Sequence, residues 1–152
     1  TRHGQGWNLK PEVFDRVGEL CGRTVGLVGY GEVPRRLAPA LQALGAHVLY
    51  TATSPKAGAL AQWRTLDELL SESDVVSLHL PLTVATANLL NDAAFTRMKR
   101  GVVLINTARG GRVDEAALHA ALRDGRLGAA GLDVFASEPV AADTSCSSMT
   151  TW

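Results

Sequence analysis

The sequence predicts a single α/β domain built on a doubly wound parallel sheet. Short runs that are apolar at nearly every position alternate along the chain with runs whose apolar residues recur at helical spacing. A continuous apolar run suits a strand that helices cover on both faces, and alternation of strands with helices is typical of a parallel sheet. The expected strands are 23–29, 46–50, 74–80, 101–107 and 128–135, and the expected helices are 33–45, 65–73, 91–100 and 113–126.

The expected helices carry polar and charged residues that suit their ends. Asn91 can cap the helix that begins beside it, because its side chain can accept a hydrogen bond from a free N–H of the first turn. Asp114 and Glu115 put negative charge at the start of the next helix, and Arg123 puts positive charge near its end, as the helix dipole favours. Residues 11–20 are expected to form one further short helix that leads into the sheet.

The composition suits one domain and excludes several classes of partner. A length of 152 residues with 46% hydrophobic content is enough for a single core. Lys and Arg together number 15, as do Asp and Glu, so no net charge draws the chain to nucleic acid or to an anionic membrane. The apolar runs are too short to span a bilayer, and two cysteines make neither a disulfide framework nor a metal site. We therefore expect a cytoplasmic protein with no metal, no nucleic-acid partner and no membrane association.

The composition also changes along the chain. Residues 1–8 are polar and are interpreted as a severed linker, and residues 9–139 are interpreted as the folded domain. From about residue 140 the chain is rich in Ser, Thr and Ala without periodicity. Residues 140–152 are therefore expected to be disordered or foreign to the fold.

Two glycines follow the first expected strand and open the helix after it. Gly29 can form the tight turn, and Gly31 lets the backbone approach a pyrophosphate at the amino end of that helix. This is two thirds of the dinucleotide fingerprint and makes the expected sheet Rossmann-type, with Glu32 and Val33 as further cofactor-binding candidates. The third position holds Pro34 instead of Gly, and the Glu32 carboxylate would repel phosphate, so weakened binding is expected. The alternative is that the motif marks only a tight strand-to-helix turn.

The end of the second expected strand lacks the acid that would bind the free ribose hydroxyls of NAD. It carries instead two threonines, Thr51 and Thr53, and a lysine, Lys56. Hydroxyls and a lysine suit a 2′-phosphate better, which favours NADP over NAD as the cofactor. The alternative is that residues 53–55 form a simple turn and that Lys56 is a solvated surface charge.

Four stretches carry a more specific signal than the glycine loop. They are GRTVGLVGYG, SDVVSLHLPLTVAT, INTARGGRVDEAAL and GLDVFASEP, in that order. Together they resemble the cofactor-binding domain of the D-isomer-specific 2-hydroxyacid dehydrogenases over about residues 9–139, and YTATSP resembles the matching segment of glyoxylate and hydroxypyruvate reductases. The resemblance implies an oxidoreductase that transfers hydride between NADP or NAD and a small 2-oxo or 2-hydroxy acid, such as glyoxylate or hydroxypyruvate.

The same resemblance implies roles for individual residues. Arg109 would bind the substrate carboxylate, which agrees with its planar guanidinium and with its position after the fourth strand, where such folds place ligands. Asp133 would contact the nicotinamide carboxamide, and Glu138 would pair with a catalytic histidine and raise the pKa of that histidine. The alternatives are, respectively, a loop cation, a strand-end cap and a solvated acid. The resemblance also implies Pro81 and Thr86 on the adenosine side, and Thr107 and Ala108 near the ribose and nicotinamide.

The histidine that would pair with Glu138 is expected in a later segment. All four histidines precede Glu138, and His79, at a strand end, is interpreted as a packed or rim residue. We therefore expect that the substrate-binding domain is absent and that the isolated chain is inactive, with a catalytically silent dinucleotide-binding or dimerisation module as the alternative. Because the family dimerises through this domain and its leading helix, whose apolar residues a lone domain could not fully cover, a homodimer is also expected.

Overall fold

The computed structural model describes residues 18–136 of the chain. The predicted linker 1–8, the predicted tail 140–152 and the predicted domain boundaries at residues 9 and 139 lie outside this range. Most of the predicted helix 11–20 also lies outside it, and its described end, residues 18–20, is not helical.

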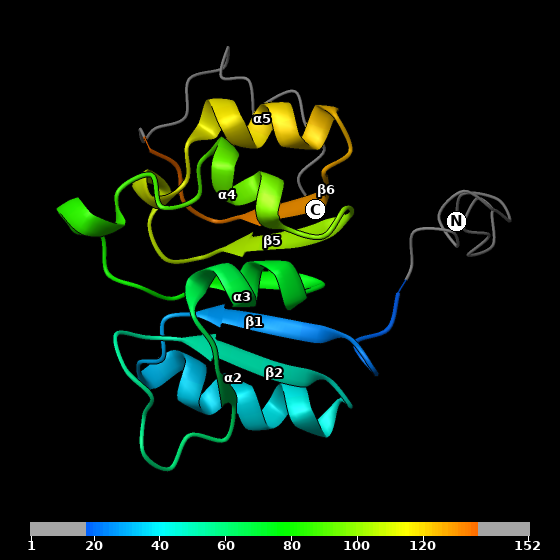
Figure 1. Ribbon diagram of the computed structural model, residues 1–152, viewed down its shortest axis with the longest axis vertical. Coiled ribbons are helices and arrows are strands. Elements are labelled where there is room, and N and C mark those ends of the chain that lie inside the picture. The colour runs from blue at the N-terminus through cyan, green and yellow to red at the C-terminus, as the bar shows by residue number, and fades with distance from the viewer. Residues whose placement is uncertain (1–17, 137–152) are drawn as a thin grey trace, which may run out of the picture.

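The described residues form one sheet of six parallel strands, which are β1 (Thr24–Val28), β2 (His47–Thr51), β3 (Gln62–Trp63), β4 (Val75–Leu78), β5 (Val102–Asn106) and β6 (Leu127–Leu132). Their order in space is β3-β2-β1-β4-β5-β6. Figure 1 labels β2, β1, β5 and β6, which follow this order across the sheet. Leu27 of β1 lies opposite Tyr50 of β2 on one side and opposite Ser77 of β4 on the other. The strand order therefore reverses between β1 and β4, where parallel sheets of this kind open a crevice for ligands.

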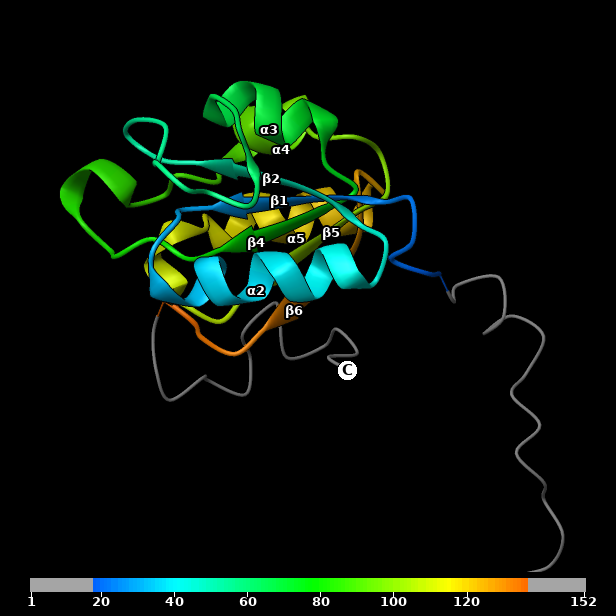
Figure 2. The same ribbon diagram turned by 90° about the horizontal axis from the view of Figure 1, so that it is seen from below.

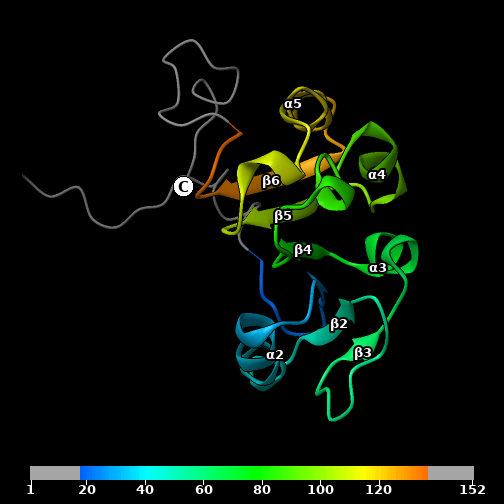
Figure 3. The same ribbon diagram turned by 90° about the vertical axis from the view of Figure 1, so that its left-hand side faces the viewer.

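Helices cover both faces of this sheet (Figures 2 and 3). One face carries α2 (Glu32–Ala43), and the other carries α3 (Leu66–Glu72), α4 (Asp92–Arg97) and α5 (Glu115–Arg123). Two short 3-10 helices, η1 (Val84–Thr86) and η2 (Gly110–Arg112), lie in the loops after β4 and β5. The predicted Rossmann-type, doubly wound parallel sheet is thus confirmed. The sequence pattern does not predict β3, because an edge strand of two residues is too short to show a period.

Side chains cap three of the helices, whereas α2 has no side-chain cap. Thr65 and Glu68 form a reciprocal capping box at the start of α3. The side chains of Asn91 and Asp114 accept hydrogen bonds from N–H groups in the first turns of α4 and α5, which confirms Asn91 as a cap. The residue before α2 is Gly31, which has no side chain to accept such a bond. The N–H groups at the start of α2 are therefore left for another acceptor.

Two apolar clusters pack against the two faces of the sheet. Successive β1 residues alternate between them, because Val25 and Leu27 belong to the cluster beneath α2 and Val28 belongs to the cluster beneath α3, α4 and α5. Gly26 lies on the same face as Val28, and a Cβ there would lie 2.5 Å from Cδ2 of Leu69. Only glycine therefore lets α3 pack this closely on β1. Full burial of each large apolar side chain in these clusters stabilises the fold by about 1.5–3 kcal/mol.

The described residues also lack two kinds of feature. Between residues 18 and 136 no helix is both long and apolar enough to cross a membrane. The same range holds no group of three or more His, Cys, Asp or Glu side chains that could bind a metal ion. Cys21 is exposed and free.

Candidate functional site

The candidate site lies at the carboxyl edge of the sheet. The strands are parallel, so the loops after β1, β2, β4, β5 and β6 all leave the same edge (Figure 2). The amino end of α2 faces that edge as well, because the helix directly follows β1. The sequence-predicted site residues within the described range lie on these loops, at the start of α2 or at the end of β2.

The glycine loop after β1 has a shape that other residues could not keep. Gly29 has a φ of +103°, and a Cβ there would lie 2.9 Å from Cδ2 of Leu80 and 3.0 Å from the carbonyl carbon of His79. Its N–H donates to the carbonyl oxygen of Thr51 at 3.0 Å, which ties the loop to β2. Gly31 differs, because a Cβ built on it meets no atom within 4 Å. The backbone at Gly31 is therefore open to a ligand, as an approaching pyrophosphate requires.

The start of α2 adds a helix terminus without a side-chain cap to this open loop. Pro34 is buried in the first turn, where its missing N–H has no helical acceptor to lose. The helix dipole and the remaining free N–H groups favour a bound anion. The residues present therefore fit a pyrophosphate, despite the proline at the third position of the fingerprint.

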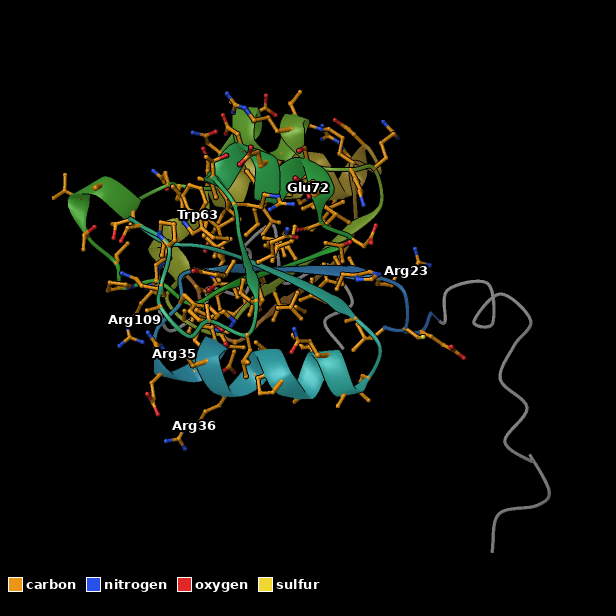
Figure 4. All side chains as sticks on the ribbon, turned by 60° about the horizontal axis from the view of Figure 1, so that its bottom comes forward. Arg23, Arg35, Arg36, Trp63, Glu72 and Arg109 are labelled. Carbon is orange, nitrogen blue, oxygen red and sulfur yellow. The ribbon has the colours of Figure 1, made fainter. Side chains whose placement is uncertain are left out.

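The charges on the first turns of α2 are mixed. The carboxylate of Glu32 accepts hydrogen bonds from Nε and Nη2 of Arg36, at 2.9 and 2.7 Å, and both side chains are exposed. The guanidinium of Arg35 lies 5.7 Å from the centre of the Tyr30 ring. Both arginines project from the helix at the same end of the domain as Arg109 (Figure 4). The predicted repulsion of phosphate by Glu32 is therefore offset by two neighbouring cations, and Val33 is exposed beside them.

The loop after β2 is held by the hydroxyls of two stacked tyrosines. The rings of Tyr30 and Tyr50 stack with their centroids 4.0 Å apart. The Tyr50 hydroxyl accepts a hydrogen bond from the N–H of Lys56 at 2.6 Å, and the Tyr30 hydroxyl accepts one from the N–H of Leu60 at 3.2 Å. Thr53 on this loop is exposed, while Thr51 and Lys56 are half-buried. The three residues predicted to suit a 2′-phosphate thus lie at the end of β2 and on the loop that follows it, and this stretch, 51–56, contains no acid.

The loop after β5 is fixed by the buried side chain of Asn106. Its Nδ2 donates to the carbonyl oxygen of Arg109 at 3.1 Å, and its Oδ1 accepts from the N–H of Ala108 at 3.2 Å. The side chain of Arg109 is exposed, and its Nη1 donates to the carbonyl oxygen of Ala108 at 2.8 Å. Thr107 is exposed on the same loop. This arrangement holds the Arg109 backbone and leaves most of its guanidinium donors available to a ligand.

The segment after β6 lies against the same loop. The N–H of Asp133 donates to the carbonyl oxygen of Asn106 at 3.0 Å, and the Asp133 side chain is exposed. A Cβ on Gly110 would lie 1.9 Å from the carbonyl carbon of Phe135, so the two backbones are in close contact. Arg109 and Asp133 therefore follow neighbouring strands at one edge of the sheet. Glu138, the predicted partner of a catalytic histidine, lies outside the described residues.

The loop after β4 supplies one wall of a pocket. The Thr86 hydroxyl donates to the carbonyl oxygen of Pro81 at 2.8 Å and accepts from the N–H of Thr83 at 2.8 Å, which closes the loop. Thr86 is half-buried and Pro81 is exposed. The pocket has a volume of about 430 Å³, and its lining residues are His79, Leu80, Pro81, Leu82, Ala108, Arg109 and Arg112.

Two of these lining residues are charged or titratable groups that sequence reasoning does not assign to the site. Nε2 of His79 lies 2.9 Å from Oγ of Ser77, and burial, followed by the charge of Arg112, lowers the pKa of His79. The side chain of Arg112 is only 1% exposed. Burial, followed by the charge of Arg109, lowers the pKa of Arg112. No sequence signal marks Arg112, since an arginine next to a glycine pair is expected on the surface.

Asn106 is another residue that sequence reasoning missed. The sequence does indicate a special role, because an asparagine that ends an otherwise apolar strand needs hydrogen-bond partners nearby. It also lies within the INTARGG stretch, three residues before Arg109. The sequence does not show that the Asn106 side chain forms hydrogen bonds with the Arg109 loop.

Three comparisons with known proteins agree with this geometry. The family described as D-isomer specific 2-hydroxyacid dehydrogenase, NAD binding domain, matches residues 2–151. Glycerate dehydrogenase of Methylorubrum extorquens is 46% identical over 136 residues, which cover 88% of this chain and 42% of that protein. Glyoxylate reductase of Aeropyrum pernix is 40% identical over 148 residues, which cover 92% of this chain and 44% of that protein.

A solved structure is similar in fold and in sequence. D-lactate dehydrogenase with NAD+ from Lactobacillus jensenii matches with a TM-score of 0.77 and 37% identity, over 80% of this chain and 37% of that one. The chain thus spans less than half the length of these relatives. The predicted resemblance to a cofactor-binding domain is confirmed.

Proposed function

We propose, since the chain belongs to the D-isomer specific 2-hydroxyacid dehydrogenase family, that it is the dinucleotide-binding part of an oxidoreductase for a small 2-oxo or 2-hydroxy acid. The observation that carries this proposal is the exposed guanidinium of Arg109, on a loop that Asn106 holds at the carboxyl edge of the sheet. Relatives named glycerate dehydrogenase and glyoxylate reductase support a substrate such as hydroxypyruvate or glyoxylate. Arg109 would bind the carboxylate of this acid through its planar fork of donors.

The described loops would hold a dinucleotide along the carboxyl edge. Gly31 would face the pyrophosphate at the start of α2, and Asp133 would receive the nicotinamide carboxamide. The bound cofactor supplies or accepts the hydride, and Arg109 keeps the acid next to it. The other proposed contacts are Gly29, Glu32, Val33, Thr51, Thr53, Lys56, Pro81, Thr86, Thr107 and Ala108.

NADP is the proposed cofactor in preference to NAD. The loop of Thr51, Thr53 and Lys56 supports this preference, because it offers hydroxyls and a cation where an acid would bind the ribose hydroxyls of NAD. The tyrosine hydroxyls that fix this loop reduce the entropy lost when it orders around a phosphate.

Calorimetric titration of the chain with NADPH and NADH tests both parts of this proposal. We expect NADPH to bind more tightly, and Lys56→Gln to reduce that preference about tenfold, as loss of a charge-assisted hydrogen bond would. Lys99→Gln is the matched control, because Lys99 pairs with Asp74 away from this loop. Tighter binding of NADH would overturn the NADP preference, and no binding of either dinucleotide would overturn the function.

Two further parts of the proposal concern the catalytic acid and the oligomeric state. Glu138, which lies outside the described residues, is proposed as the acid that pairs with a catalytic histidine. Homodimer formation is supported by a groove of about 700 Å³ whose lining includes half-buried Val75, Val103 and Ile105 on the sheet, an apolar surface that a second copy could cover. Sedimentation at micromolar concentration should show a dimer, and a monomer would contradict this part. The cytoplasmic location stays a prediction.

A further inference from the structure

Arg112 is held rigidly beside the Arg109 loop. It is the last residue of η2, and its carbonyl oxygen accepts a hydrogen bond from the N–H of Leu90 at 3.0 Å. The N–H of Val113 donates to the carbonyl oxygen of Gly110 at 3.0 Å, and Val113 also forms a bridge with Leu90. The backbone on both sides of Arg112 is therefore fixed, and its side chain, only 1% exposed, is enclosed by the fold.

The guanidinium of Arg112 is buried without sufficient acceptors. Its Nε and Nη1 are buried and donate no hydrogen bond within the part of the chain that the structure describes. Buried polar groups in folded proteins are nearly always paired, and an unpaired buried charge is costly. The neighbouring charge that lowers the pKa of Arg112 is that of Arg109, which is also positive. Arg112 thus needs an acceptor that the described residues do not provide.

The pocket that Arg112 lines offers room for such an acceptor. Its volume of about 430 Å³ lies within the range of small-molecule sites. Its lining contains Arg109 and Arg112 but no acid, and the pKa of its one histidine, His79, is lowered by burial and by Arg112. A ligand whose single carboxylate binds the exposed Arg109 would leave the Arg112 guanidinium buried and unpaired.

The structure assigns to Arg112 the binding of a second anionic group, a carboxylate, sulfonate or phosphate, on the acid whose first carboxylate Arg109 binds. This inference rests on the proposed function and narrows its substrate class to 2-oxo or 2-hydroxy acids with two anionic groups. The cofactor pyrophosphate offers the same chemistry from a neighbouring source, because Gly29 of the glycine loop abuts His79 and Leu80. The two sources are separated by testing the acid without the cofactor.

Titration of the chain with glycolate and with tartronate, in separate calorimetric experiments at constant ionic strength, tests the inference. The two 2-hydroxy acids differ by one carboxylate. We expect tartronate to bind at least tenfold more tightly, as one added charge-assisted hydrogen bond to a buried group would produce. Equal affinities would overturn the inference.

Variants assign the preference to one side chain. Arg112→Leu and Arg112→Gln should reduce the tartronate preference to within about twofold, and Arg112→Lys should keep part of it, because lysine retains the charge without the planar fork. Arg109→Leu should weaken both acids, and Arg97→Leu, on α4 outside the pocket, should change neither. A preference that persists in both neutral Arg112 variants would overturn the inference.

Stability and cofactor measurements distinguish the remaining outcomes. Replacing a buried unpaired charge by an apolar group is often neutral or stabilising, so Arg112→Leu should unfold at a denaturant concentration no lower than that of the wild-type chain. If Arg112→Leu weakens NADPH and the wild type shows no tartronate preference, the pyrophosphate is the partner and the inference fails. If tartronate binds preferentially but no dinucleotide binds, the proposed function fails while the Arg112 site stands.

Discussion

The β1–β3 half and the β4–β6 half of the sheet form their sides of the site by different means. In the β1–β3 half, Gly31 and the start of α2 present open backbone, and no charged side chain is buried there. In the β4–β6 half, the buried side chain of Asn106 fixes a loop, and two arginines, Arg109 and Arg112, line one pocket. The free N–H groups of the first half suit a pyrophosphate. The guanidinium groups of the second half suit an anion, such as a carboxylate, whose oxygens match their paired donors.

Substitutions at one glycine in each half give the largest expected difference in the free energy of unfolding. Gly110→Ala would place a Cβ 1.9 Å from the backbone of Phe135, so the segment after β6 must move, and we expect a loss of about 3 kcal/mol in the free energy of unfolding. Gly31→Ala meets open space and should cost less than about 1 kcal/mol, while it weakens NADPH binding. Denaturant unfolding and calorimetry measure both effects. Equal destabilisation by the two variants would refute the contrast.

Asn106 tests the rigidity of the β4–β6 half. Asn106→Leu leaves the carbonyl oxygen of Arg109 and the N–H of Ala108 without their side-chain partner, and we expect a loss of about 2 kcal/mol in the free energy of unfolding. Weaker binding of glycolate should accompany it, because the Arg109 loop is no longer held. Thr107→Ala, at an exposed neighbour, should stay within about 0.5 kcal/mol of the wild type. Unchanged glycolate affinity in Asn106→Leu would show that the loop is held by other contacts.

Tyr50 tests the corresponding support in the β1–β3 half. Tyr50→Phe removes the hydroxyl that accepts the N–H of Lys56 and should cost about 1 kcal/mol in the free energy of unfolding. NADPH should bind several-fold more weakly, as calorimetry would measure, because the loop around Thr53 loosens. Glycolate affinity should not change, since its site is in the other half. A loss of affinity for both ligands would mean that the two halves are coupled.

The expected effect of His79 on stability depends on pH and is absent at neutral and alkaline pH. Burial, followed by the charge of Arg112, lowers the pKa of His79 in the folded state below its ordinary value of 6.5. The unfolded chain therefore takes up this proton first, so the free energy of unfolding should fall as the pH drops below about 6.5, by at most about 1.4 kcal/mol per pH unit. His79→Gln should flatten this part of the stability profile measured by denaturant unfolding. An unchanged slope in that variant would assign the effect to another group.

The carboxyl-edge loops were predictable because they depend on local pattern. Alternating apolar and helical runs indicate which segments are strands, and parallel strands bring the loops that follow them to one edge. Asn91, as a cap, and Asp114, as a negative charge, marked the starts of α4 and α5 for the same local reason, since both effects act within one turn. Local pattern could not predict β3, which pairs through only two residues.

The glycine loop, the place of Arg109 after β5 and the alternation of helices with every strand except β3 can be predicted from the amino-acid sequence, because all of them depend on residues close together in the chain. The contact of Gly110 with the backbone at Phe135 and the burial of the Arg112 guanidinium beside His79 are visible only in the folded molecule. These contacts join residues more than twenty positions apart, and their energies depend on packing and desolvation, which are properties of the assembled fold.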